Sequence, residues 1–338
     1  MKEIVVIKDF KNDIGNKRVL FITTKELSYL RNVQEINYLK KDSKRLRIIG
    51  SENKKYLFRL IKVYSQILQL EPDEFDTVFI GFSPQLILPL FYWKFRKKEI
   101  IIDFFISAYD TFVNDRKIVT ENNILAKIMY KLDRITLKWA KHIVVDTKAD
   151  LNYFSKEFEC ERNKFSVLYL EANKEIFYPR PQNKPDDLKD KFVVLYFGSI
   201  LPLQGVDIVL ETIKLLENER SIFFQIIGPI PEKYEKPIQN NVEYIEWLNQ
   251  DELANYIANS DLCLAGHFSG KIDKAKRTIA GKAYIYYAMG KPVILGECEA
   301  NKERFSKSDL IYFVRQGSPV ALKTKIMELV HRFSINDT

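Results

Sequence analysis

Two basic residues and two glycines carry the strongest chemical signal in this sequence. Arg277 and Lys282 lie near the start of a predicted helix, which the buried strand 293–295 follows. Gly198 and Gly205 bound a turn between another apolar run and the next predicted helix. A helix N-terminus with cations nearby offers backbone N–H groups and positive charge to a phosphate. These residues therefore predict the binding of a phosphorylated ligand.

Both patterns also have a purely structural interpretation. The turn 198–205 is neither a GxGxxG motif nor a P-loop, and any turn from a strand to a helix can contain two glycines. Arg277 and Lys282 are equally compatible with the solvated end of a helix. The spacing alone leaves these interpretations open.

A second group of polar residues follows a buried-looking strand in the first half of the chain. Asp103 ends that strand, and a short loop then contains four candidates for the acceptor side of a site, Ser107, Tyr109, Asp110 and Arg116. Loops at strand ends carry functional residues more often than the strands do. The alternative to a functional role is that Asp103 only caps the loop.

The elements around these residues alternate between strand and helix in two sets. Strands at 18–23, 46–49, 77–80, 100–103 and 142–146 alternate with helices, and a second set with a strand at 192–197, a helix near 231–238 and a helix from about 279 follows. This order is typical of α/β folds with parallel, doubly wound sheets. We expect an N-terminal domain at 1–175, a linker at 176–190 and a C-terminal domain at 191–338. Residues 1–15 are a candidate edge strand.

Composition narrows the class of protein. A chain of 338 residues with 46% hydrophobic residues is long enough for two cores. It contains no apolar run of the roughly 18 residues that cross a bilayer, and its start is too charged for a signal peptide. Three scattered cysteines predict reduced thiols and no metal site. We therefore expect a cytoplasmic location.

Positive charge is concentrated at the N-terminus. Residues 1–62 contain 16 Lys/Arg against 7 Asp/Glu, whereas the rest of the chain is nearly neutral. Four of these cations, Lys54, Lys55, Arg59 and Lys62, alternate with apolar residues and predict a helix with one basic face. That face indicates either an anionic membrane surface, at the inner side of the cell membrane, or ordinary solvation. The aromatic residues fall on the apolar face, which disfavours nucleic acid as a partner.

Several ordered motifs resemble one enzyme family. FGSILPLQGVDIVLETIKLL, NVEYIEWLNQDELANYIANSDLCLAG and KRTIAGKAYIYYAMGKPVILGE together resemble the C-terminal half of a GT-B glycosyltransferase of family 4. IIDFFISAYDTFVNDRK and KLDRITLKWAKHIVVDTKADLNYF resemble the N-terminal half in a bacterial polysaccharide or glycolipid branch. The resemblance covers about residues 75–330.

The resemblance implies a fold and an activity. The fold is two Rossmann-like domains whose parallel sheets face each other across a cleft. The activity is transfer of a sugar from a UDP- or GDP-linked donor to a glycan or lipid-linked acceptor. The resemblance implies that the sugar keeps its anomeric configuration and that no metal or other cofactor takes part. The expected role is the assembly of a surface polysaccharide or glycolipid. The turn that contains Gly198, Ser199, Gln204 and Gly205 would approach the donor's diphosphate, which Arg277 and Lys282 would balance.

Two positions depart from the family pattern. Asp103 stands where many relatives have an active-site His facing the donor sugar, so the resemblance implies a catalytic Asp. Ile285 stands where the family commonly has the Glu that holds the donor's ribose, and Glu297 or Glu299 is the candidate replacement. An inactive GT-B subunit that positions an active partner is therefore the alternative to an active transferase.

Overall fold

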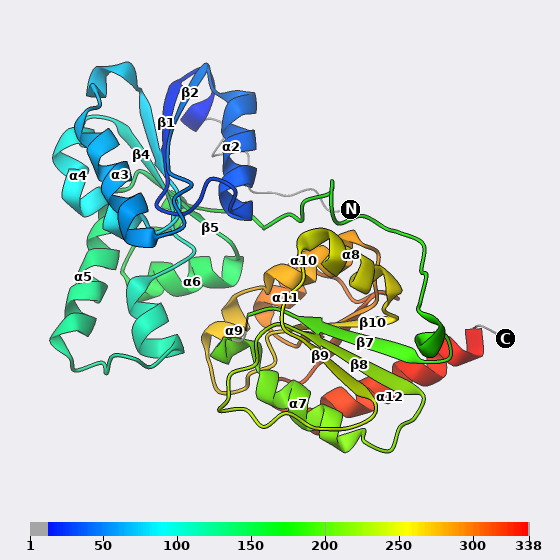
Figure 1. Ribbon diagram of the computed structural model, residues 1–338. Helices are drawn as coiled ribbons and strands as arrows, with labels where there is room; N and C mark the ends of the chain where they lie inside the picture. The colour runs from blue at the N-terminus through cyan, green and yellow to red at the C-terminus, as the bar shows by residue number, and fades with distance from the viewer. Residues whose placement is uncertain (1–12, 200, 337–338) are drawn as a thin grey trace. The chain divides into compact units, whose positions relative to one another are not determined.

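The computed structural model describes residues 13–199 and 201–336 (Figure 1). The chain forms two compact units, which divide between Glu171 and Ala172. Most of the candidate edge strand at 1–15 lies outside the described residues. Among those residues, no helix is long and apolar enough to cross a membrane.

The N-terminal unit is built on a parallel sheet of six strands in the order β2-β1-β3-β4-β5-β6. The central strands are buried along their whole length, as expected for apolar runs that have helices on both sides. The strands are β1 (Arg18–Ile22), β2 (Arg45–Ile49), β3 (Thr77–Ile80), β4 (Glu99–Asp103), β5 (His142–Val145) and β6 (Phe165–Val167).

Helices cover both faces of this sheet. The crossover from β1 to β2 runs in the opposite direction to the four later ones, so right-handed crossovers place the first helix on one face and the other four on the opposite face. Figure 1 shows α2 and α3 on opposite sides of the sheet. The helices are α2 (Leu30–Asp42), α3 (Tyr56–Leu68), α4 (Leu88–Phe95), α5 (Ile124–Trp139) and α6 (Lys148–Glu157).

A buried ionic cluster joins α2 to the end of β4. The Arg31 guanidinium donates to both oxygens of Asp103, at 3.0 and 2.9 Å, and also to the carbonyl of Leu168. Glu35, one turn further along α2, lies 3.5 Å from Arg31 and is fully buried. Burial, followed by the charge of Asp103, raises the pKa of Glu35 well above its usual range. The cluster therefore places one cation against two buried carboxyl groups.

The C-terminal unit repeats the architecture. Its parallel sheet has the order β12-β11-β10-β7-β8-β9. The strands are β7 (Phe192–Phe197), β8 (Ile222–Ile227), β9 (Val242–Ile245), β10 (Leu262–Gly266), β11 (Val293–Gly296) and β12 (Ile311–Val314). The helices are α7 (Val206–Leu215), α8 (Gln250–Asn259), α9 (Lys274–Arg277), α10 (Gly281–Ala288), α11 (Glu299–Arg304) and α12 (Pro319–Asn336).

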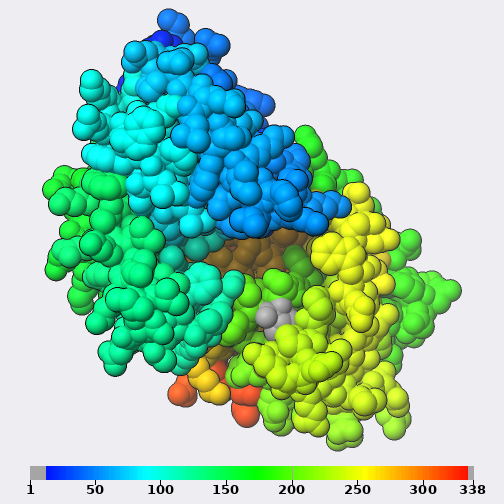
Figure 2. Space-filling view, turned by 60° about the vertical axis from the view of Figure 1, so that its left-hand side comes forward, coloured from blue at the N-terminus to red at the C-terminus, as the bar shows by residue number. Residues whose placement is uncertain are grey.

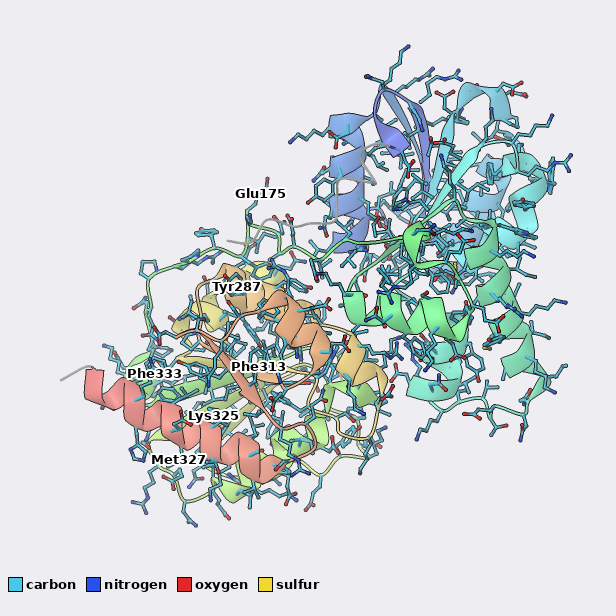
Figure 3. All side chains as sticks on the ribbon, turned by 180° about the vertical axis from the view of Figure 1, so that it is seen from behind. Glu175, Tyr287, Phe313, Lys325, Met327 and Phe333 are labelled. Carbon is cyan, nitrogen blue, oxygen red and sulfur yellow. The ribbon has the colours of Figure 1, made fainter. Side chains whose placement is uncertain are left out.

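The last helix closes the core of this unit. Met327 and Phe333 project from α12 (Figure 3), and both pack against the cluster that α7 and β8 form. The Phe333 ring stacks on that of Phe192, with 6.0 Å between the ring centroids. The C-terminal helix therefore supports the first strand of its own sheet.

Three elements differ from expectation. No helix forms at 231–238, where Pro231 and Pro237 interrupt the segment and the Tyr234 N–H donates to the Pro231 carbonyl in a turn. The helix expected from about 279 is α10, and the separate short α9 precedes it. Helix α11 had no predicted counterpart.

The order of strands locates the ligand-binding edge of each sheet. In the C-terminal unit the crossovers reverse direction between β7 and β10, which are neighbours in the sheet. Loops that leave the carboxyl ends of two such strands diverge and leave room for a ligand. The turn 198–205 follows β7 and the loop 267–273 follows β10, so both lie at this switch point.

The ionic cluster predicts a pH-dependent stability of the N-terminal unit. Because the folded-state pKa of Glu35 lies above its unfolded value of 4.5, its contribution is present at low pH and is lost as pH rises through the folded pKa. We expect Glu35→Gln to flatten the decline in stability as pH rises above the unfolded-state pKa of 4.5, measured by urea denaturation. Glu71→Gln, at an exposed position, is the control. An unchanged pH dependence in Glu35→Gln would contradict a raised pKa of Glu35 in the folded protein.

Candidate functional site

The turn after β7 has the geometry of an anion site. Gly198 and Gly205 both have positive φ angles, 138° and 66°, which L side chains rarely adopt. The second glycine directly precedes α7, so the turn delivers the N-terminus of a helix of ten residues. Ser199 is exposed between them.

Close backbone contacts fix this turn. A Cβ at Gly205 would lie 2.4 Å from the backbone N of Ser269, and one at Gly228 would lie 2.3 Å from the carbonyl oxygen of Gly198. The Phe268 N–H also donates to the Gln204 carbonyl at 3.0 Å. The glycines thus let the ends of β7, β8 and β10 approach one another.

Lys282 enters the turn from the second residue of α10. Its Nζ donates to Gln204 Oε1 at 2.8 Å and lies 3.7 Å from the ring centroid of Tyr196. A Cβ built on Gly198 would lie 3.1 Å from the same Nζ. The Tyr196 hydroxyl also donates to Gln204 Oε1, at 2.9 Å. Sequence reasoning missed Tyr196, which it treated only as part of a strand.

The amino group of Lys282 is buried without a counter-ion. Only 5% of the residue is exposed, and it forms no ion pair with a carboxylate of the described chain. Burial lowers the pKa of Lys282 well below its usual value. An anion placed beside Nζ would restore the charged form, so the site is electrostatically prepared for one.

Arg277 and Lys282 do not share a helix. Arg277 is the last residue of α9, is 92% buried, and has its Nε 3.8 Å from Asp273 Oδ2. The link to α10 is held by His267, whose Nδ1 lies 3.0 Å from the Thr278 carbonyl. Burial lowers the pKa of His267 to about 3, so the ring is neutral and donates to that carbonyl.

The candidate carboxylates lie apart from the turn. Glu297 is exposed and pairs with Lys302 at 2.7 Å, in a pocket of about 390 Å³ whose other lining residues include Phe305, Lys307 and Lys325. No residue of the turn lines this pocket. Glu299 is the exposed first residue of α11. Ile285 is half-buried on α10.

The expected acceptor-side loop is shaped by an Asp that the sequence did not single out. Asp133, buried on α5, accepts from the Ser107 hydroxyl at 2.7 Å and from the backbone N–H groups of Ala108 and Tyr109. Burial raises the pKa of Asp133 to about 6. The Ser107 hydroxyl oxygen in turn accepts from the Asp110 N–H at 2.9 Å. Ser107 and Asp110 are thus buried parts of a turn, whereas Tyr109 is half-buried and Arg116 is exposed.

Two expected roles need correction. Asp103 is 1% exposed and both of its oxygens accept from Arg31, so it is part of the buried ionic cluster and does not offer a free oxygen to a sugar. Arg59 is 2% exposed and donates to the carbonyls of Thr24 and Asn53. It therefore does not belong to a basic surface, whereas Lys54, Lys55 and Lys62 are exposed.

The C-terminal unit is similar to a known family of sequences. Residues 191–332 match the family model described as "Glycosyl transferases group 1". The chain is also 23% identical over 210 residues to an "Uncharacterized 41.2 kDa protein in cps region" of Klebsiella pneumoniae. That match covers 59% of this chain and 55% of the relative, so the chain spans about half the length of this relative.

Comparison with solved structures identifies the fold. The chain superposes on HepE of Anabaena in complex with UDP with a TM-score of 0.62, at 11% identity, covering 93% of this chain and 90% of that one. The fold is GT-B. A sucrose-phosphate synthase from Thermosynechococcus elongatus matches with a TM-score of 0.63, at 11% identity and the same coverage. A putative UDP-N-acetylglucosamine 2-epimerase from Listeria monocytogenes matches at 0.54 and 12% identity, covering 94% and 88%. GT-B architecture is therefore present in proteins of different activities. The function has to be inferred from the site and not from the fold alone.

The close approach at Gly205 predicts a large stability cost for any side chain there. We expect Gly205→Ala to destabilise the C-terminal unit by about 2 kcal/mol or more, from the left-handed conformation together with the clash against Ser269. Gly290→Ala is the matched control, because Gly290 has a φ of 68° but its Cβ would meet no atom closer than 3.8 Å. Equal destabilisation of the two variants in urea would contradict a backbone contact at Gly205.

Replacing Lys282, in contrast to Gly205, should increase the stability of the ligand-free protein. Replacing Lys282 by Met removes a buried ammonium group while keeping most of the side chain's volume. We expect Lys282→Met to raise the free energy of unfolding of the ligand-free protein by about 1 kcal/mol at neutral pH. Urea denaturation measures this, with the exposed Lys271→Met as control. A loss of stability in Lys282→Met would contradict an uncompensated buried charge.

Proposed function

We propose that this protein is a retaining glycosyltransferase of the hexosyltransferase type, which transfers a sugar from a UDP- or GDP-linked donor to a glycan or lipid-linked acceptor. The proposed role is surface polysaccharide or glycolipid assembly, at the inner face of the cell membrane. The family of residues 191–332 supports the reaction class, and the cps-region relative supports the polysaccharide role. HepE, which shares the fold, was solved with UDP and with UDP-glucose.

The single observation that carries this proposal is the buried Lys282 ammonium at the glycine turn. A diphosphate bound to the N-terminus of α7 would receive backbone N–H groups from the turn and positive charge from Lys282. Many relatives place cations in the turn itself, where this chain has Ser199 and Gln204. Here α10 delivers the ammonium to the same turn, and Gln204 orients it.

The chemistry follows from this arrangement. When the bond between the sugar and the diphosphate breaks, negative charge develops on the leaving phosphate oxygens. A positive group fixed in a dry site stabilises that charge in the transition state. Lys282 supplies it at the turn, and Arg277, at the end of α9, is the proposed second cation. We propose no metal or other cofactor for this step.

Ile285 favours a second candidate function. An apolar side chain accepts no hydrogen bond from a ribose hydroxyl, and Glu297 is paired with Lys302 in a separate pocket. An inactive GT-B subunit that positions an active partner fits these two observations. Activity therefore has to be tested separately from nucleotide binding.

The pKa of Lys282 predicts that nucleotide binding takes up a proton. The ligand-free lysine has a lowered pKa, and a neighbouring diphosphate raises it. We expect the calorimetric enthalpy of UDP or GDP binding, near pH 8, to vary with the ionisation enthalpy of the buffer, and we expect this variation to vanish in Lys282→Met. Lys189→Met, at an exposed position before the amino end of β7, is the control here. Tight, buffer-independent binding by the parent would contradict the assignment.

The proposed role of Lys282 and Arg277 in catalysis predicts a large fall in reaction rate when either is replaced. We expect Lys282→Met and Arg277→Ala each to lower the rate of donor-sugar hydrolysis or transfer by roughly 10²–10³-fold, as for the loss of one electrostatic contact in the transition state. The measurement is release of UDP or GDP from a panel of nucleotide sugars, with circular dichroism to check folding. Parent protein that binds a nucleotide but releases none from any donor would support the inactive-subunit alternative. Parent-like rates in both variants would exclude these residues from catalysis.

A further inference from the structure

Helix α3 exposes the side that its sequence suggests should be buried. Arg59 lies inside and donates to the Thr24 and Asn53 carbonyls, whereas Leu57, Phe58 and Ile61 are more than half exposed. The buried apolar residues of the helix are only Val63 and Ile67. An apolar strip therefore runs along the outside of α3.

Helix α4 extends this strip. The Tyr64 hydroxyl donates to the Leu86 carbonyl at 2.7 Å, and Lys94 Nζ donates to the Leu68 carbonyl at 2.6 Å, so the two helices lie side by side (Figure 1). Leu68 itself, Leu90 and Trp93 are again more than half exposed. In Figure 2 the light-blue surface of α3 and the cyan surface of α4 adjoin on one face of the unit. We call these six apolar side chains the α3–α4 surface: Leu57, Phe58, Ile61, Leu68, Leu90 and Trp93.

Positive charge predominates along both helices of this surface, although acidic residues flank them and Asp73 pairs with Lys98 at 3.5 Å. Residues 54–70 contain four Lys/Arg and no Asp or Glu, and residues 84–98 contain the same numbers. Arg59 is buried, but Lys54, Lys55 and Lys62 on one helix and Arg96 and Lys97 beyond the other are exposed. The occupant of the surface must therefore combine an apolar interior with negative charge at its boundary.

We propose that the α3–α4 surface docks on an anionic lipid bilayer, with the apolar side chains inserted below the headgroups. Lysines at the border of an apolar strip keep their ammonium groups among lipid phosphates while their stems lie along the acyl region. Trp93 is an aromatic residue suited to the interface between water and acyl chains. The inference refines the membrane location proposed above, by naming apolar insertion of α3 and α4 as its basis.

A second copy of the chain is a less suitable occupant. In a two-fold symmetric dimer the same surface faces itself, so the lysines of one copy would meet the lysines of the other. Residues 54–70 and 84–98 contain no acidic residue to pair with these lysines, so lysine-to-lysine contacts would weaken such an interface. A bilayer that contains phosphatidylglycerol supplies the missing negative charge.

The test is flotation of the whole chain with vesicles. The vesicles contain phosphatidylcholine with about one third phosphatidylglycerol, at low salt and at about 0.5 M salt. We expect the triple variant Leu57→Ser, Phe58→Ser, Ile61→Ser to lower the partition coefficient at least about 100-fold at both salt concentrations. The triple variant Lys54→Gln, Lys55→Gln, Lys62→Gln should lower it by a similar factor at low salt and much less at high salt.

Matched controls distinguish insertion of the α3–α4 surface from nonspecific adsorption of the protein to vesicles. Ile238→Ser combined with Val320→Ser removes two exposed apolar side chains from the C-terminal unit, and we expect parent-like partitioning. Trp93 reports insertion directly: brominated lipid should quench a component of the fluorescence that is absent in Trp93→Phe. Circular dichroism checks that each variant is folded.

The outcomes are decisive. Parent protein that does not float with the anionic vesicles, or a serine triple variant that floats as well as the parent, overturns the proposal. So does a parent that sediments as a dimer while the serine variant is a monomer, because the occupant is then a second copy. None of these readouts uses a nucleotide sugar, so failure here leaves the proposed transfer reaction untouched, and the reverse also holds.

Discussion

A buried lysine amino group without a counter-ion is the constraint around which the C-terminal unit is organised. Lys282 donates to one neutral oxygen, that of Gln204, and lies over the ring of Tyr196. Such a group costs stability in the ligand-free protein, because burial disfavours its charged form. Binding of an anion at this position would explain why the loss of stability is tolerated, because the same low-dielectric surroundings strengthen the attraction between the anion and Lys282.

The backbone around Lys282 also fits the proposed binding of an anion. Glycines at 198, 205 and 228 allow three strand ends to converge at the switch point of the sheet. The neutral His267 fixes the link between α9 and α10, and so the point at which Lys282 leaves its helix. Rigid packing here means that the ammonium group needs little reorganisation when an anion arrives.

The N-terminal unit places its charges differently. Arg31 and Asp103 pair inside the protein, with Glu35 buried beside them, and Arg59 donates to main-chain carbonyls. These buried cations are structural. Their withdrawal from the surface leaves α3 and α4 with an outer face of apolar side chains and lysines, and this is the chemistry that fits an anionic bilayer. The proposed diphosphate site and the proposed lipid surface thus lie in different units.

The sequence by itself determined the two alternating sets of strands and helices, because apolar runs and helical periodicity are local signals. It also predicted the glycine turn and Lys282 as parts of a phosphate site, and the structure brings the two together. Only the tertiary structure decided which charged residues are free to bind. Asp103 and Arg59 have the residue types of a site, yet partners 72 and 35 positions away in the chain engage them. The exposed side of α3 was likewise undetermined, because its sequence contains apolar residues on more than one face and burial depends on what α4 and β2 leave uncovered.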